Sequence, residues 1–194
     1  MSLLRWLPTF LAFPLGGLLA MLLLGGSLDP LRALVAGAVV GAIVGGTQWL
    51  ALGSRAGWRW LVATVVAMSG ASAVAFLVFG APVTPTAAVL TGLVTGAAVG
   101  AAQGLVLRAG VRAGVVWAFV VAGCWAIGWL VTSAVIVDID RGHAVFGSSG
   151  AALVTLVTGV VLRMLLGRRA TRRTERGAEA PQAPTATPAH VTGA

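Results

Sequence analysis

The chain of 194 residues lacks lysine, asparagine and tyrosine entirely, and it contains one cysteine, Cys124. A single cysteine excludes an intramolecular disulfide and a four-cysteine metal site. Charge is also scarce, because charged residues make up 9% of the chain, against roughly a quarter in soluble domains. With 58% apolar residues, a water-soluble fold would expose large apolar patches and aggregate. The sequence therefore excludes a soluble globular protein and predicts an all-helical integral membrane protein.

Ionisable side chains are missing from the middle of every long apolar stretch. Proton-coupled transporters and voltage sensors usually carry such a residue within the membrane, and acid–base hydrolases need paired carboxylates. Cys124 has no base near it in the sequence, which disfavours a nucleophilic role. We therefore assign no catalytic residue and expect a non-enzymatic protein without a cofactor.

One short segment gathers potential metal ligands, namely Asp138, Asp140, Arg141 and His143. Two carboxylates and one imidazole on a loop are a poor signature for a metal site. Acidic groups are favoured at a helix N-terminus by the helix dipole. We therefore interpret this segment as a helix cap and predict no metal site.

The uncharged stretches have the length of membrane spans, because a hydrocarbon core of about 30 Å needs about 20 apolar residues as helix. The longest of them, from Trp60 to Leu107, is broken by a turn-forming run of Gly and Pro at 80–85. Asp29-Pro30 and Thr84-Pro85 are typical helix starts. A signal peptide is the alternative for the first span, but no cleavage site follows it. The sequence predicts six helices, roughly 7–26, 30–53, 58–79, 85–108, 113–137 and 143–166.

The arginines are divided unevenly between the two sides that six spans create. With both termini inside, the outer loops hold Arg32 and Arg141, and the other eleven of 13 basic residues lie inside. This distribution predicts that both termini are cytoplasmic. The absence of Lys, Asn and Tyr beside abundant Ala, Gly and Val is typical of a GC-rich bacterial genome, so we expect a protein of the bacterial inner membrane. Four tryptophans would then lie near the inner interface as an aromatic belt: Trp6, Trp58, Trp60 and Trp117.

Six of the inner arginines end the last span or follow it closely: Arg163, Arg168, Arg169, Arg172, Arg173 and Arg176. In a soluble protein a pI of 11.9 would suggest nucleic-acid binding. Here the favoured interpretation is an anchor to anionic lipid headgroups. We divide the chain into a transmembrane domain, 1–166, and a cytoplasmic tail, 167–194, which is Arg-rich and then Ala/Pro/Thr-rich. The tail has little to bury, so we expect it to be disordered.

A pattern of small and polar residues recurs with an offset of 55 residues. The first two copies are Gly37, Gly41, Gly45, Gln48, Leu52 and Gly92, Gly96, Gly100, Gln103, Leu107. A third copy has decayed to Gly147, Ala151, Thr155, Thr158 and Leu162. Because two helices return the chain to the same side, the pattern predicts three parallel-related hairpins, about 5–55, 56–110 and 111–166. They would form a pseudo-threefold bundle.

The repeated residues suggest packing faces and one polar layer. Glycines at i, i+4 and i+8 share a helix face and let two backbones approach closely. We therefore interpret seven residues as helix-packing positions: Gly37, Gly41, Gly45, Gly92, Gly96, Gly100 and Gly147. Gln48, Gln103 and Thr158 occupy equivalent positions and would form a layer near the inner side. This layer is either interhelical hydrogen bonding or a constriction or ligand-binding ring.

Two tryptophans lie one helical turn apart in the middle of the fifth predicted span. Trp125 and Trp129 are away from both predicted interfaces. They either pack as bulky core residues or form an aromatic wall for a flat or lipidic ligand. The sequence leaves both interpretations open.

The string Gly41-x3-Gly45-x2-Gln48-Trp49, continued by Leu52, resembles a loose group of uncharacterised bacterial multi-pass membrane proteins with repeated Gly-x3-Gly-x2-Gln-Trp helical hairpins. The resemblance covers most of 30–166. It departs in the first copy, where Gly53 replaces an arginine. It implies the hairpin repeat but no activity, so no functional residue is transferred. In size and helix count the chain also resembles the solute-binding subunits of energy-coupling vitamin transporters.

Two functions are compatible with these features. The first is a structural or accessory membrane protein that acts through glycine-lined helix packing. The second is a carrier, channel or solute-binding subunit for a small neutral or lipidic molecule, with Gln48, Gln103 and Thr158 as its polar layer. The expected partners are the lipid bilayer and either another membrane protein or further copies of the chain. No nucleic-acid partner is expected.

Overall fold

The computed structural model describes residues 3–25, 29–53, 56–135 and 148–178. All regular structure in these ranges is helical, and they contain no strand. Six helical segments are long and apolar enough to cross a membrane, with mean hydropathies between 1.6 and 2.2. The predicted fold class, an all-helical protein with six potential membrane spans, is therefore confirmed.

The first span consists of three consecutive helical pieces, and the other five are single α-helices. The pieces are α1 (Leu3–Trp6), the 3-10 helix η1 (Leu7–Leu11) and α2 (Ala12–Leu24). The single helices are α3 (Pro30–Leu52), α4 (Trp58–Phe79), α5 (Pro85–Leu107), α6 (Val111–Val135) and α7 (Ser148–Ala178). Their limits agree closely with the predicted spans, except in the first and last helices.

Two helices begin with the caps that the sequence predicts. Asp29 Oδ1 accepts a hydrogen bond from the backbone N–H of Arg32 at 2.8 Å. Thr84 Oγ1 accepts one from the backbone N–H of Ala87 at 3.2 Å. A proline follows each cap, where its missing N–H costs nothing because the first helical N–H groups have no partner in the helix.

The first and last spans differ from the predicted ranges. The first was expected as one helix over 7–26, but it begins at Leu3 and changes to 3-10 geometry from Leu7. Pro8 lies in the first turn of that 3-10 segment, where its missing N–H and fixed φ are tolerated. The last helix was expected to end at 166, but it continues to Ala178. Arginine and alanine are strong helix formers, so the helix extends through the arginine run.

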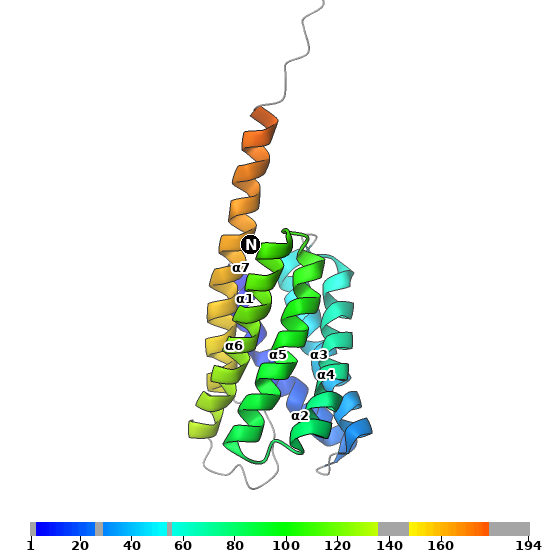
Figure 1. Ribbon diagram of the computed structural model, residues 1–194. Coiled ribbons are helices and arrows are strands. Elements are labelled where there is room, and N and C mark those ends of the chain that lie inside the picture. The colour runs from blue at the N-terminus through cyan, green and yellow to red at the C-terminus, as the bar shows by residue number, and fades with distance from the viewer. Residues whose placement is uncertain (1–2, 26–28, 54–55, 136–147, 179–194) are drawn as a thin grey trace, which may run out of the picture.

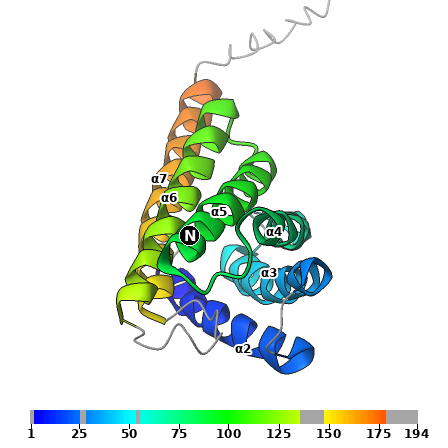
Figure 2. The ribbon, with the colours of Figure 1, turned by 60° about the horizontal axis from the view of Figure 1, so that its bottom comes forward.

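The spans stand side by side in chain order around the bundle (Figure 2). Helices α3 and α4, and α5 and α6, make the most extensive contacts, while the first span packs against both α3 and α7 and closes the ring. In Figure 1 the start of α1 and the far end of α7 lie at the same end of the bundle.

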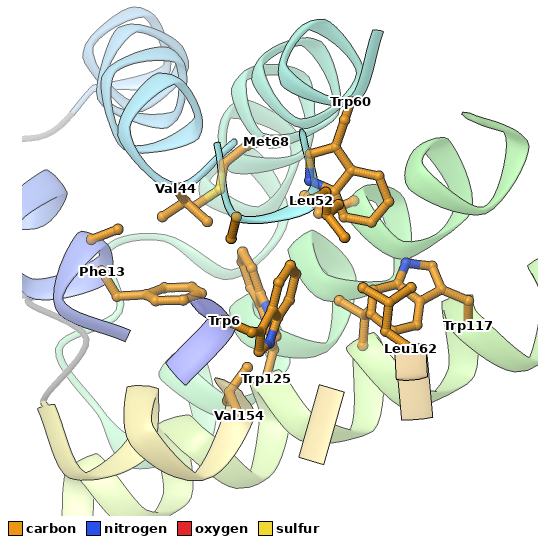
Figure 3. Packing of buried hydrophobic residues seen from close by; sticks show 14 of the residues in the cluster. Trp6, Phe13, Val44, Leu52, Trp60, Met68, Trp117, Trp125, Val154 and Leu162 are labelled. Atoms are coloured by element: carbon orange, nitrogen blue, oxygen red, sulfur yellow. The ribbon is translucent and has the colours of Figure 1, made fainter. Parts of the chain in front are cut away.

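The centre of the bundle is filled by large side chains (Figure 3). Trp6 and Trp60 are 0% exposed and Trp117 is 1% exposed. Six aliphatic core residues are spaced by the repeat offset, and none exceeds 6% exposure: Val44, Val99, Val154, Leu52, Leu107 and Leu162. This filling leaves the described core without room for a wide axial pore.

Candidate functional site

The two glutamines of the predicted polar layer meet inside the bundle. Gln103 Nε2 on α5 donates hydrogen bonds to Gln48 Oε1 on α3, at 3.2 Å, and to Thr64 Oγ1 on α4, at 2.9 Å. Both glutamines are buried. Thr64 in turn donates to the backbone oxygen of Trp60 at 2.8 Å. Three helices are thus connected by hydrogen bonds between buried side chains.

Two indoles complete this network. Trp60 Nε1 on α4 donates to Gln48 Oε1 at 3.1 Å, and Trp117 Nε1 on α6 donates to Gln103 Oε1 at 3.1 Å. The two rings lie 6.1 Å apart between centroids. We call Gln48, Gln103, Thr64, Trp60 and Trp117 the amide–indole network. Each of its helices is tied to at least one other by a bond between buried polar groups, which fixes the helices in register.

The predicted aromatic belt is wrong for three of its four members. Trp6, Trp60 and Trp117 are fully buried, whereas Trp58 is 61% exposed. An indole has a single N–H donor, which needs an acceptor when the ring is buried. Each of the three buried indoles donates to an oxygen inside the bundle. They are therefore core residues, even though they lie near helix ends in the sequence.

Thr158, the third residue of the predicted layer, is buried on α7 but bonds to its own helix. Its Oγ1 donates to the backbone oxygen of Val154 at 2.7 Å and to that of Thr155 at 3.3 Å. Among the described side chains, none forms a hydrogen bond with the Thr158 hydroxyl. A threonine side chain is too short to reach across as an amide does. The structure thus brings Gln48 and Gln103 together and leaves Thr158 outside their hydrogen bonds.

Helix α7 receives an indole from the first span instead. Trp6 Nε1 donates to the backbone oxygen of Thr155 at 2.9 Å. Gly159 permits this approach, because a Cβ at that position would lie 2.5 Å from Trp6 Cδ1. Any larger residue at Gly159 would push the indole away. The first span is therefore held to the last one by a buried hydrogen bond and a glycine contact.

The predicted packing glycines of α3 face α4, and those of α5 face α6. A Cβ at Gly41 would lie 3.0 Å from the Cα of Val65, and a Cβ at Gly100 would lie 2.8 Å from the Cα of Ala118. Four further predicted glycines meet the same partner helices: Gly37, Gly45, Gly92 and Gly96. Backbones this close exclude larger side chains. Gly147 lies outside the described residues.

Trp125 and Trp129 line a cavity of about 140 Å³. The cavity lies among α2, α3, α4, α5 and α6, in the half of the bundle away from the chain ends. Phe13 also lines it, with its ring edge-on to that of Trp125 at 5.6 Å between centroids. Its walls are mostly apolar, with hydroxyls only from Ser72, Thr91 and Thr95. The predicted aromatic pair therefore borders a partly open cavity, and not only packed core.

All arginines with described side chains except Arg32 lie at the end of the bundle where α1 begins and α7 ends. Arg163 is exposed on α7, as are Arg5, Arg59, Arg108 and Arg112 near other helix ends. Arg59 and Arg108 border a shallow depression of about 500 Å³ with Trp58. Five arginines of the predicted anchor follow Arg163 along α7, and their side chains lie outside the described part: Arg168, Arg169, Arg172, Arg173 and Arg176. Arg32 lies at the opposite end, beside Asp29.

The remaining candidate positions lie partly outside the described residues. The segment with Asp138, Asp140, Arg141 and His143 lies outside the described residues. Within the described ranges, no three His, Cys, Asp or Glu side chains come together. Cys124 is half-buried on α6 as a free thiol. The chemistry that the described side chains offer is hydrogen bonding by amides, indoles and hydroxyls.

Sequence reasoning missed the indoles as hydrogen-bond donors. Trp6, Trp60 and Trp117 follow one another at intervals of 54 and 57 residues, close to the repeat offset. This spacing indicates that the three tryptophans occupy equivalent positions. A tryptophan near the end of a span is, however, usually interpreted as a residue of the membrane interface. It also missed three glycines in close helix contacts: Gly104 against α6, Gly150 against α6 and Gly159 against the first span.

Comparisons with known proteins found no matching protein-family model, no matching curated protein and no matching solved structure. The resemblance to the Gly-x3-Gly-x2-Gln-Trp hairpin proteins therefore stays a prediction. The amide–indole network, the glycine contacts and the cavity are the features on which a function can be based.

Proposed function

We propose that the protein is a non-enzymatic structural or accessory component of a bacterial inner membrane. It acts as a rigid six-helix element whose helices are fixed by close glycine contacts and buried hydrogen bonds. The amide–indole network is the observation that carries this proposal. Three of the four polar side-chain atoms of Gln48 and Gln103 bond inside the bundle, so these atoms hold helices together and have little capacity left for a solute.

A test of this proposal replaces both amides by methionine, which has a similar length and no strong donor or acceptor. Gln48→Met with Gln103→Met removes four hydrogen bonds. At about 0.6 kcal/mol for each bond within a membrane, we expect the free energy of unfolding to fall by about 2 kcal/mol. The measurement is the midpoint of unfolding of detergent-purified protein by increasing SDS, followed by near-ultraviolet circular dichroism.

Thr47→Val is the matched control, because the Thr47 hydroxyl bonds only to carbonyls of its own helix. This substitution should leave the midpoint of unfolding nearly unchanged. Native mass spectrometry of the wild type and the double variant, released from mild detergent, provides the functional readout. We expect the two spectra to show the same bound species. A stoichiometric small molecule on the wild type that the double variant loses would make the amides a binding site and overturn the proposal.

We further propose that the bundle contains three related packing units. In two of them an indole of the second helix donates to a glutamine of the first, Trp60 to Gln48 and Trp117 to Gln103. In the third, Trp6 donates to the Thr155 backbone oxygen. The units would be α3–α4, α5–α6 and α7 with the first span, so that the third unit joins the first and last spans. They are shifted by one helix from the hairpins predicted from the sequence, about 5–55, 56–110 and 111–166, because the most extensive contacts are between α3 and α4 and between α5 and α6. The buried valines and leucines at the repeat offset support this pseudo-threefold arrangement.

The distribution of arginines supports cytoplasmic placement of both chain ends. Arg5, Arg59, Arg108, Arg112 and Arg163 all lie on the end of the bundle where α1 begins. Arginines are enriched on the cytoplasmic side of membrane proteins. The depression beside Arg59 and Arg108 would face the headgroups of the inner leaflet, where a positive side chain attracts anionic lipid by about 1 kcal/mol.

Cysteine labelling tests this orientation. In a Cys124→Ala background, Val83→Cys lies between α4 and α5, and Val111→Cys lies at the start of α6, at the opposite end. Both valines are exposed, at 47% and 85%. A membrane-impermeant maleimide applied to intact cells should label Val83→Cys and should label Val111→Cys only after lysis. The reverse pattern would place the chain ends outside and contradict the proposed topology.

The alternative, a carrier, channel or solute-binding subunit that uses Gln48, Gln103 and Thr158, is the weaker proposal. The hydroxyl of Thr158 is bonded to its own helix, and the glutamine atoms are mostly bonded to indoles and to each other. A transport route through this layer would also have to displace the buried tryptophans beside it.

A further inference from the structure

We propose that the cavity among α2, α3, α4, α5 and α6 binds the end of a neutral, single hydrocarbon chain that carries one hydroxyl or carbonyl oxygen. This site is distinct from the amide–indole network and goes beyond a purely structural function. The oxygen of the bound chain would pair with the hydroxyl of Thr91. A bilayer-derived lipid or fatty alcohol has this chemistry.

The size and lining of the cavity define this class of ligand. Its volume is about 140 Å³, close to that of an engineered protein cavity of about 150 Å³ that stays dry and binds benzene. Phe13, Met68, Phe76, Trp125 and Trp129 provide most of its large walls. A space of this kind favours apolar atoms over water. It accommodates the end of a chain and not a whole lipid, and its partial opening lets the rest of the molecule extend outward.

Small residues create the space in which the chain end would lie. Gly17 on α2, and Ala33, Ala36 and Gly37 on α3, also line the cavity. Among the residues that the structure describes, no charged side chain lines it, so an ionised ligand would leave its charge uncompensated in an apolar environment. The ligand is therefore neutral at the end that enters.

Thr91 supplies the polar feature that indicates an oxygen on the ligand. Four described threonines, Thr47, Thr64, Thr95 and Thr158, donate their hydroxyl to the carbonyl four residues earlier. Three buried threonine hydroxyls form no hydrogen bond among the described residues: Thr9, Thr91 and Thr155. Of these three residues, only Thr91 lines the cavity. A buried polar group without a partner is costly. Because less than 1 Å² of the Thr91 hydroxyl oxygen is accessible, a rotation about χ1 would have to turn it into the cavity, where a ligand oxygen would satisfy it.

Two variants test the site in complementary ways. Ala36→Leu fills the cavity from α3, and Ala42→Leu makes the same substitution at an exposed position of the same helix. Thr91→Val removes the hydroxyl and preserves the shape of the side chain. The probes are a long-chain alcohol with a photoreactive diazirine near its hydroxyl end, and the analogue that lacks the hydroxyl. Labelled peptides are quantified by mass spectrometry after illumination of the purified protein in mild detergent.

We expect saturable labelling of α5 and α6 peptides around Thr91 and Trp125 in the wild type and in Ala42→Leu, and its loss in Ala36→Leu. Thr91→Val should weaken binding of the alcohol by about 2- to 10-fold, the equivalent of one hydrogen bond, and leave the hydroxyl-free probe unchanged. Labelling that never saturates, or that is equal in Ala36→Leu and Ala42→Leu, would overturn the site. Equal loss of both probes in Thr91→Val would overturn the role of its hydroxyl.

If Ala36→Leu does not fold, the comparison of the two probes on Thr91→Val still decides the proposal. This outcome is independent of the amide–indole network, because Gln48→Met with Gln103→Met should retain saturable labelling. Loss of labelling in that double variant alone would mean that the chain binds at the glutamines, which would contradict the assignment of the cavity.

Discussion

Trp6→Ala is expected to lower the free energy of unfolding by about 3 kcal/mol, the lower end of the range for Trp→Ala substitutions in protein cores. The lower end applies because, when the first span separates from the bundle, the Trp6 side chain enters lipid and not water. The substitution therefore removes mainly packing contacts and little hydrophobic transfer free energy. Trp6 is 0% exposed, donates to the Thr155 backbone oxygen and lies on Gly159. Its removal would leave a void between the first and last spans.

The measurement is the SDS midpoint of the detergent-purified variant, together with protease accessibility of the first span in membranes. Trp58→Ala is the matched control, because Trp58 is 61% exposed. This substitution should change the free energy of unfolding by less than about 0.5 kcal/mol, as surface substitutions do. A Trp6→Ala variant as stable as Trp58→Ala would show that the first span does not depend on α7. The proposed third packing unit would then be wrong.

Gly45→Leu should disrupt the contact between α3 and α4, at a cost of about 1–3 kcal/mol from overpacking. A Cβ at Gly45 would lie 2.9 Å from the Cβ of Thr64 and 3.3 Å from the backbone oxygen of Leu61. These atoms belong to the backbone or to its first side-chain carbon, so they cannot move without shifting α4. Because Gln48 is on the same face of α3, the shift should also stretch its bond to Trp60.

Gly46→Leu provides the same substitution one residue further along, where an added Cβ has no neighbour within 4 Å. We expect it to unfold at nearly the wild-type SDS concentration, because its side chain would face outward. Near-ultraviolet circular dichroism, which reports the fixed environment of the tryptophans, should change in Gly45→Leu and not in Gly46→Leu. Equal stability of the two variants would contradict the proposed role of glycine packing.

Much of the fold could be predicted because the residues within each span are sufficient to identify it. Uncharged stretches of sufficient length predict the spans, and the two Asp/Thr-Pro pairs predict helix starts that the structure confirms. The limits of the last helix could not be predicted, because arginines that mark the membrane edge are also good helix formers. The first span was less predictable still, since a proline in the first turn is compatible with either an α-helix or the 3-10 segment that the structure has around Pro8.

The sequence predicted individual residues of the candidate sites, but it did not predict which of them contact one another. The offset of the two glutamines singled them out, and the structure joins them through one hydrogen bond. Their indole partners were assigned to the interface, because a tryptophan near a span end has the same sequence pattern whether it faces lipid or the core. Which of these applies depends on helix rotation, which is set by contacts with other helices.

The sequence by itself determined the class of protein, the six potential spans and the residues that are small or polar within them. A membrane span is a run of about 20 consecutive apolar residues, so its position can be predicted from a short stretch of sequence. The tertiary structure alone decided that the α3 glycines face α4, that Trp6 contacts α7, and that Phe13, Thr91 and Trp125 border one cavity. These groupings join residues far apart in the chain. They depend on which helix faces pack together, and lipid and helix interiors are too alike in polarity for hydropathy to distinguish those faces.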